Sequence, residues 1–177
     1  MTYFFENVEF FSFLSELIAT MIGVATGIPI ALWLDRKIAA RHRKEDAIKI
    51  LTALKDEITH NIALLKQMQG EPPSEVIFYN LSLSTWEATS GRRLEAVENY
   101  ELVRHISRIY YEFQHLSRKV DVQFHMHYSV LLAMSNYDKI RGSIVGPIIA
   151  HASTLEKESE SLLAEIDEEL SRLGKKL

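Results

Sequence analysis

The sequence FLSELIATMIGVATGIPIALWL, residues 13–34, is apolar apart from Glu16 near its beginning. From Leu17 to Leu34 it contains no charged side chain at all. A helix of these 22 residues would be about 33 Å long at about 1.5 Å per residue, which is enough to cross a hydrocarbon core of about 30 Å. A soluble core helix is the alternative, but such a long apolar run leaves no polar face for water. We therefore predict a transmembrane helix over 13–34.

The residues before this run argue against a cleaved signal peptide. Such a peptide begins with basic residues, has a shorter apolar stretch and ends at a small-residue cleavage site. Here the charged residues are Glu6, Glu9 and Glu16, and the first basic residue is Arg36. We therefore expect the run to remain in the protein as an anchor.

A basic cluster directly follows the apolar run. It consists of Arg36, Lys37, Arg41, Arg43 and Lys44. Basic residues that flank a span stay in the cytoplasm, so the sequence predicts a single-pass protein of the cell (inner) membrane with its N-terminus outside and its large C-terminal domain in the cytoplasm. Residues 1–12 then form an extracytoplasmic aromatic segment, and Trp33 marks the inner interface. The basic cluster is expected to lie against anionic lipid headgroups.

Small residues recur at every fourth position within the predicted span. They are Ala19, Gly23, Gly27 and Ala31. This spacing places them on one helix face, where small side chains let two helix backbones approach closely. The alternative is that Gly and Ala are simply common in spans. We predict that the span forms a homo-oligomer or packs against the span of a partner membrane protein.

The composition of the chain limits the classes of function. None of the 177 residues is Cys, which excludes disulfides, thiolate zinc sites and cysteine nucleophiles. The net charge is −4, whereas a general nucleic-acid binder is usually basic, so we expect no nucleic-acid partner. Residues 35–177 have the length of one modest domain, which we expect to be cytoplasmic.

Helical periodicity continues after the span and predicts an all-α fold. The transmembrane helix is expected to continue into a stalk helix over 35–69, and a connector follows over 70–98. Two more helices, over 99–135 and 146–173, complete an antiparallel bundle of about three long helices with coiled-coil-like spacing. The predicted apolar stripes are Leu51, Leu54, Ile58, Ile62 and Leu65; Leu102, Ile106, Ile109, Phe113, Leu116 and Val120; and Ala152, Leu155, Leu162, Ile166, Leu170 and Leu173.

Local signals predict where the helices of this domain begin. Asn99 is a favoured N-cap for the helix that follows it. Ser84 and Glu87, three residues apart, match a capping box for a short helix in the connector, and Trp86 is expected to pack into the bundle. Pro147 suits the first turn of the last helix.

Two Glu-x-x-His pairs, Glu57 with His60 and Glu112 with His115, match the ligand pattern of di-iron carboxylate bundles. On a wheel of about 100° per residue they lie roughly 80–165° from the centres of their apolar stripes. A metal core requires inward side chains, so this placement argues against a di-metal site.

The remaining motifs are weaker. His125 and His127 lie on different faces of a helix, and Asp121 with His125 is expected to be a solvated pair. No Gly-rich phosphate loop, HExxH or GxSxG occurs in the sequence. We therefore expect no catalytic residue, no metal site, no cofactor and no enzymatic activity.

Four stretches resemble recurring features of small prokaryotic membrane-anchored proteins. They are Trp33–Arg36, Leu54–Asn61, Ser84–Glu87 and Ile109–Tyr111. Those proteins are mostly uncharacterised, and some lie near phage-defence or abortive-infection genes. The resemblance covers most of the chain and implies one N-terminal span with a cytoplasmic helical domain. Its motifs are packing and capping signals, so it carries over no catalytic residue.

Together these features predict a non-enzymatic, membrane-tethered interaction or scaffold module. It would oligomerise through its span in the lipid bilayer and present its helical bundle to a protein partner in the cytosol. Two alternatives stay open. One is an oligomeric membrane effector of a defence type that forms a pore or disturbs the bilayer, and the other is a metal-dependent helical-bundle enzyme.

Overall fold

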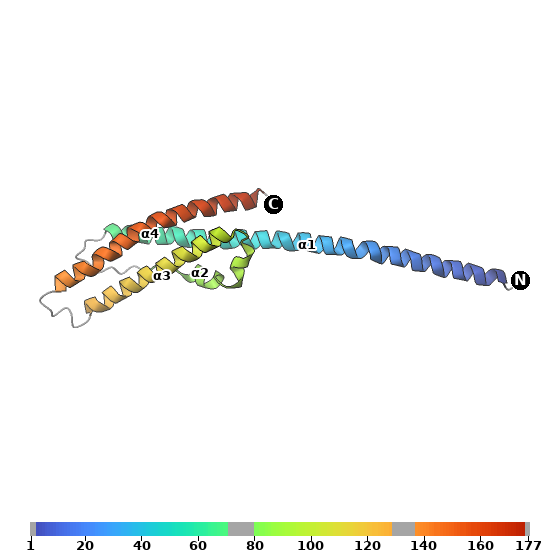
Figure 1. Ribbon diagram of the computed structural model, residues 1–177, viewed down its shortest axis with the longest axis horizontal. Coiled ribbons are helices and arrows are strands. Elements are labelled where there is room, and N and C mark those ends of the chain that lie inside the picture. The colour runs from blue at the N-terminus through green and yellow to red at the C-terminus, as the bar shows by residue number, and fades with distance from the viewer. Residues whose placement is uncertain (1–2, 71–79, 129–136, 176–177) are drawn as a thin grey trace. The chain divides into compact units, whose positions relative to one another are not determined.

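The computed structural model describes residues 3–70, 80–128 and 137–175, with side chains from Ser12 onward except at Arg92, 126–128 and 137–141. All regular structure within these ranges is helical, which confirms the predicted all-α class. The elements are α1 (Tyr3–Gly70), α2 (Ser84–Thr89), the short 3-10 helix η1 (Arg92–Ala96), α3 (Tyr100–Tyr128) and α4 (Tyr137–Gly174) (Figure 1). Most side chains of the predicted aromatic segment 1–12 lie outside the described residues.

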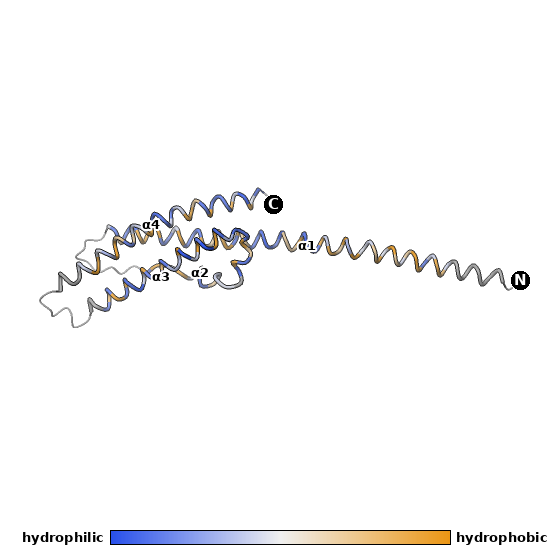
Figure 2. The backbone as a smooth tube through the Cα atoms, viewed as in Figure 1, coloured by the Kyte–Doolittle hydropathy of each residue, from blue (hydrophilic) through white to orange (hydrophobic). Residues whose placement is uncertain are grey.

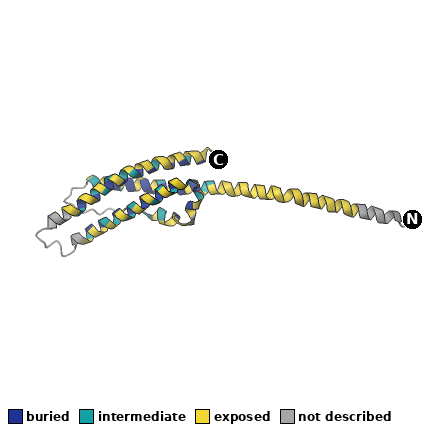
Figure 3. Ribbon diagram, viewed as in Figure 1, coloured by how far each residue is buried: buried dark blue, intermediate teal, exposed yellow. Residues whose placement is uncertain are grey.

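The chain divides into two compact units, Met1–His42 and Arg43–Leu177, and α1 contributes residues to both. In the first unit every side chain from Ser12 to His42 is exposed (Figure 3). The apolar residues colour much of this part of α1 orange in Figure 2. Among the described helices, α1 is long and apolar enough to cross a membrane, and none of its apolar window is buried within the chain.

The second unit has one hydrophobic core, to which α1, η1, α3 and α4 all contribute. The stripes predicted for α1 and α3 are buried throughout, and that of α4 is buried except at the half-buried Leu170. The buried residues of these stripes are Leu51, Leu54, Ile58, Ile62 and Leu65 of α1, Leu102, Ile106, Ile109, Phe113, Leu116 and Val120 of α3, and Ala152, Leu155, Leu162, Ile166 and Leu173 of α4. Burial of each large apolar side chain contributes about 1.5–3 kcal/mol, so these stripes supply much of the stability of the unit.

Polar pairs line the edges of this core. They join α1 to α4 at Lys55–Asp167 and at Lys66–Glu160 (2.9 Å), and α3 to α4 at His105–Glu165 (3.1 Å) and Arg108–Glu158 (2.8 Å). All of these pairs are at least partly exposed, so each contributes at most about 1 kcal/mol. These pairs contribute little to stability, but they show which residues of the helices lie side by side.

The helix boundaries follow the predicted signals at one position and depart from them at another. The Asn99 Oδ1 atom accepts a hydrogen bond from the Leu102 N–H (3.2 Å), which confirms Asn99 as the cap of α3. Helix α4 begins at Tyr137, nine residues before the predicted start at 146, and Pro147 lies inside it. Proline removes one helical hydrogen bond, but Val145 and Ile148 on either side are buried in the core, and this packing holds the helix together. The predicted end of the preceding helix, at 135, lies outside the described residues.

The start of α2 is held by a distant residue, not by the predicted capping box. Leu83 occupies the N-cap position and makes no side-chain cap. Instead the Glu57 carboxylate of α1 accepts hydrogen bonds from the N–H groups of Thr85 (2.9 Å) and Trp86 (3.1 Å). A carboxylate at a helix N-terminus satisfies the free N–H groups and interacts favourably with the helix dipole. The local Ser84-to-Glu87 interpretation was therefore wrong, because a carboxylate from α1 takes that role.

Three hydroxyl groups complete the surroundings of Glu57. Its carboxylate also accepts hydrogen bonds from Ser82 Oγ (2.8 Å), Ser84 Oγ (3.1 Å) and Tyr110 Oη (2.8 Å). Asn61, one turn further along α1, exchanges two hydrogen bonds with the backbone of Ser82, at 2.8 and 2.7 Å. Hydrogen bonds to two buried polar side chains, Glu57 and Asn61, thus hold the connector against α1.

Trp86 packs into this region as predicted. Its ring stacks on Tyr110 with centroids 4.8 Å apart and an interplanar angle of 8°. The rings of Tyr110 and Phe113 are perpendicular, with centroids 5.5 Å apart. Burial and the adjacent Glu57 carboxylate raise the pKa of Tyr110, so its hydroxyl stays protonated and donates to Glu57.

Candidate functional site

The four small residues of the predicted packing stripe, Ala19, Gly23, Gly27 and Ala31, are all exposed on α1. Apart from the adjoining residues and backbone of α1 itself, a Cβ atom added at Gly23 or at Gly27 would meet no described atom within 4 Å. Thr20 and Thr26 donate their hydroxyls to the carbonyls of Glu16 and Ile22, both at 2.8 Å, so these hydroxyls already have acceptors within the helix. The stripe is therefore a narrow, exposed face of α1 that no described side chain covers.

The basic cluster follows on the same helix. Arg36, Lys37, Arg41 and Arg43 are exposed, and Lys44 is half-buried. The Lys37 ammonium lies 5.2 Å from the centroid of the Trp33 ring, which is within the range of a cation–π interaction. This contact places the Lys37 cation next to the aromatic ring that was predicted to mark the membrane interface.

Of the two Glu-x-x-His pairs, the first has a structural role, which Glu57 fulfils. Burial would raise the pKa of Glu57, but the hydrogen bonds from Thr85, Tyr110, Ser82 and Trp86 outweigh burial and lower it. His60 is exposed. Glu57 therefore acts as a structural anion, and its five hydrogen bonds leave little capacity to ligate a metal.

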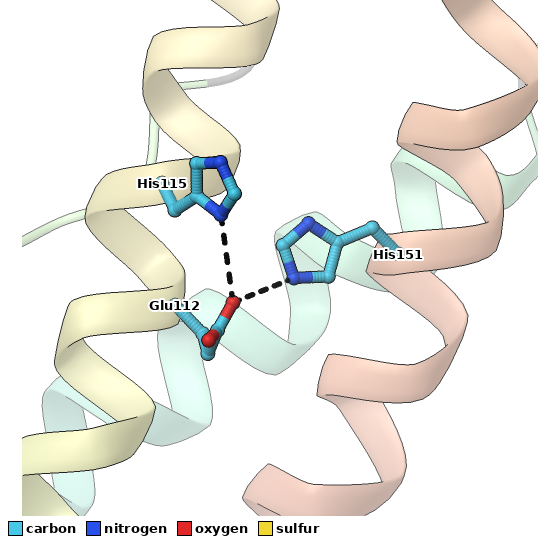
Figure 4. Close-up of side chains that lie close together, drawn as sticks. All are labelled: Glu112, His115 and His151. Carbon is cyan, nitrogen blue, oxygen red and sulfur yellow. Dashed lines mark hydrogen bonds and ion pairs between the residues drawn. The ribbon is translucent and has the colours of Figure 1, made fainter.

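The second pair, Glu112 and His115, lies next to a histidine that the sequence analysis did not single out. His151 projects from α4 toward Glu112 and His115 on α3 (Figure 4). The Glu112 Oε2 atom lies 3.0 Å from His151 Nε2 and 3.8 Å from His115 Nδ1. The rings of the two histidines approach edge-to-face, with centroids 5.7 Å apart. We call these three residues the His–Glu cluster.

A lysine fixes the tautomer of His151 within this cluster. The Lys119 Nζ atom lies 3.2 Å from His151 Nδ1. An ammonium group only donates, so Nδ1 is the acceptor and the ring proton sits on Nε2, from which it is donated to Glu112. Burial and the Lys119 charge lower the pKa of His151, in spite of the opposing effect of Glu112, so its imidazole is neutral at pH 7.

The His–Glu cluster lies at the edge of the core and opens to solvent. The exposed fractions of the side chains are 31% for Glu112, 51% for His115 and 18% for His151. An open groove runs beside the cluster and is lined by Arg108, Glu112, His151, Thr154, Leu155 and Glu158. Two imidazoles and one carboxylate at such an edge can hold a metal ion or pass protons to water.

Sequence reasoning found two members of this cluster and missed the third. The sequence pattern singled out Glu112 and His115 as a Glu-x-x-His pair, but His151 lies on another helix. Only the register of α3 against α4 brings it near. The other predicted candidates do not gather: Asp121 and His125 are exposed, and the side chain of His127 lies outside the described residues.

Comparison with known proteins found no relative of this chain. No family model, no curated protein and no solved structure matches the chain.

Proposed function

We propose that this chain is a non-enzymatic, membrane-tethered scaffold module that oligomerises through α1 and presents its helical domain to protein partners in the cytosol. The observation that carries the proposal is the stretch Leu17–Leu34, which has no charged side chain and is exposed on all sides. Apolar surface in water is unfavourable by about 25 cal/mol per Å². A bilayer removes that penalty, so residues 13–34 are the segment that would cross the cell (inner) membrane.

The basic cluster supports the proposed orientation, in which residues 1–12 are extracytoplasmic and residues 35–177 are cytoplasmic. All five cations follow the apolar stretch, and none precedes it. Basic residues next to a span are retained in the cytoplasm, and each contributes about 1 kcal/mol of attraction to an anionic leaflet.

The small-residue stripe supports the proposed assembly. Because no described part of the chain covers Gly23 and Gly27, the backbone of a second α1 would be able to approach this face closely. Thr20 and Thr26 satisfy their hydroxyls within the helix, so association here would rest on van der Waals packing. A second copy of this chain, or the span of a partner membrane protein, would fit such a face.

The polar pairs support an antiparallel bundle of three long helices in the cytoplasmic domain. From His105 to Arg108 of α3 the partners in α4 fall from Glu165 to Glu158. From Lys55 to Lys66 of α1 the partners in α4 fall from Asp167 to Glu160. Such opposed numbering is what helices running in opposite directions produce, and it agrees with the coiled-coil-like spacing of their apolar stripes.

Crosslinking in native membranes tests the assembly. The double replacement of Gly23 and Gly27 by Leu should abolish a crosslinked dimer, because two added side chains would block close approach of the backbones. Replacement of Ala25 by Leu is the matched control, since Ala25 lies roughly opposite this stripe on a helical wheel. A wild-type protein that stays monomeric in membranes, or a dimer equally sensitive to the Ala25 control, would refute the assembly.

Labelling tests the orientation, and the absence of native Cys makes single-cysteine variants clean probes. A membrane-impermeant maleimide added to intact cells should label Thr2→Cys and spare Ser171→Cys. Labelling of Ser171→Cys alone would indicate the opposite orientation. Dye leakage from liposomes that contain the purified protein would favour the membrane effector over the scaffold.

A further inference from the structure

We propose that Glu112, His115 and His151 bind one divalent first-row transition-metal ion between α3 and α4. This inference does not rest on the membrane proposal, because all three residues belong to the second compact unit. It differs from the di-metal pattern considered in the sequence, since it uses one Glu-x-x-His pair and a histidine from another helix.

The distances between the donor atoms suit a single ion. Tetrahedral bonds of about 2.1 Å place two ligand atoms about 3.4 Å apart. The Glu112 Oε2 atom lies 3.0 Å from His151 Nε2 and 3.8 Å from His115 Nδ1. All three donor atoms lie within 4.8 Å of one another, so small rotations of the side chains would close the site.

The donor types select the class of metal. Imidazole nitrogens suit zinc, iron, nickel and copper ions, whereas calcium and magnesium prefer oxygen donors alone. Two histidines and one carboxylate are a ligand set of zinc and non-haem iron sites that retain open positions. Here water would fill those positions, because His115 is half-exposed and the groove beside Glu112 and His151 opens to solvent.

The backbone beneath the site is rigid. Phe113 and Leu116 follow Glu112 and His115 directly in α3, Ala152 follows His151 in α4, and all three are fully buried in the core. Side chains placed on packed helices hold their geometry better than side chains on loops. An ion at this position would join α3 to α4 by direct bonds.

Lys119 opposes the binding of this ion by His151. A metal bound to His151 Nε2 replaces the proton on that nitrogen, and the imidazole then carries its proton on Nδ1. The Lys119 ammonium, 3.2 Å from Nδ1, would face a donor where it now meets an acceptor. The lysine must therefore move away when metal binds, and removing its charge should favour binding.

Metal titration of the full chain in detergent micelles tests the proposal. Protein stripped of metal by a chelator is titrated with Zn²⁺ against a chromophoric competitor, and with Co²⁺ for its visible spectrum. We expect saturable one-to-one binding, weakened at least about 100-fold by His115→Asn or by His151→Gln, since the loss of second-shell partners alone costs about 10–100-fold. Lys119→Met should bind Zn²⁺ more tightly than the wild type.

The control uses a similar pair of side chains on the same two helices. His105 of α3 lies 3.1 Å from Glu165 of α4, but among the described residues no third metal-ligating side chain joins this pair. His105→Gln should leave Zn²⁺ affinity unchanged, and circular dichroism verifies that each variant is folded. The proposal is overturned if the wild type shows no saturable binding, if His105→Gln weakens binding as much as His151→Gln, or if Lys119→Met fails to tighten it.

Discussion

Replacing Glu57 with Gln is expected to release the connector from α1. Glu57 is 6% exposed, and its carboxylate accepts five hydrogen bonds, two of them from the N–H groups of Thr85 and Trp86. Thr85 donates to Oε1 and Trp86 donates to Oε2, so the NH₂ group of the glutamine must face one of these donors in either orientation. At least one backbone N–H therefore loses its acceptor.

The magnitude follows from this geometry. A buried donor left without an acceptor costs about 1–3 kcal/mol, and the bonds that survive weaken to roughly half when the acceptor becomes neutral. We expect Glu57→Gln to lower the free energy of unfolding by about 2–4 kcal/mol. Tyr110→Phe should lose about 1 kcal/mol in the wild type and less in the Glu57→Gln background, because the two residues share one hydrogen bond.

The same carboxylate makes stability depend on acid. Its hydrogen bonds lower the pKa of Glu57 in the folded state below the ordinary 4.5. The folded state therefore prefers the ionised form, and this contribution is present above the pKa of the unfolded chain and is lost as pH falls through the lowered value. Glu57→Gln should remove that part of the acid dependence.

Urea unfolding measures both effects. The chain contains two Trp, so Trp33→Phe leaves Trp86, which stacks on Tyr110, as the single fluorescent reporter. In this background, unfolding curves of the full chain in micelles are compared with and without Glu57→Gln at neutral and acid pH. A change below about 0.5 kcal/mol, the size of an ordinary surface substitution, together with an unaltered acid dependence would refute the reasoning.

Three further substitutions are predicted for the same unfolding assay. Asn61→Ala removes both hydrogen bonds to the Ser82 backbone and should cost about 1–3 kcal/mol; a cost near zero would mean that water replaces them. Phe113→Ala empties a fully buried site and should cost about 3–5 kcal/mol, and a smaller loss would indicate that the core collapses around it. Lys55→Ala breaks the exposed pair with Asp167 and should cost less than about 1 kcal/mol, a loss that high salt should abolish.

The core was predictable from the sequence because helical periodicity is local. The three- and four-residue spacing of apolar residues such as Leu54, Ile58 and Phe113 identifies the faces that the structure buries. The cap at Asn99 was predictable for the same reason, since its partner Leu102 lies only three residues away.

The misses all involve contacts between distant parts of the chain. Glu57 replaces the expected capping box because it reaches Thr85 from another helix, 28 residues away. Helix α4 extends before Pro147 because core packing of Val145 outweighs a lost hydrogen bond. His151 joins Glu112 across 39 residues, and the register that unites them depends on how α3 and α4 pack. One sequence alone does not encode that register in a readable pattern.

The order of α1 before α4 in the chain has a consequence for synthesis on the ribosome. Lys55 and its partner Asp167 are 112 residues apart, so the apolar stripe of α1 is complete long before α4 exists. At about 5–20 residues per second the interval is about 6–22 s. During that time α4 is missing from the core that buries Leu51, Leu54 and Ile58 in the folded chain. Until α4 is made, this stripe is an apolar surface that favours aggregation unless α3 or another protein covers it.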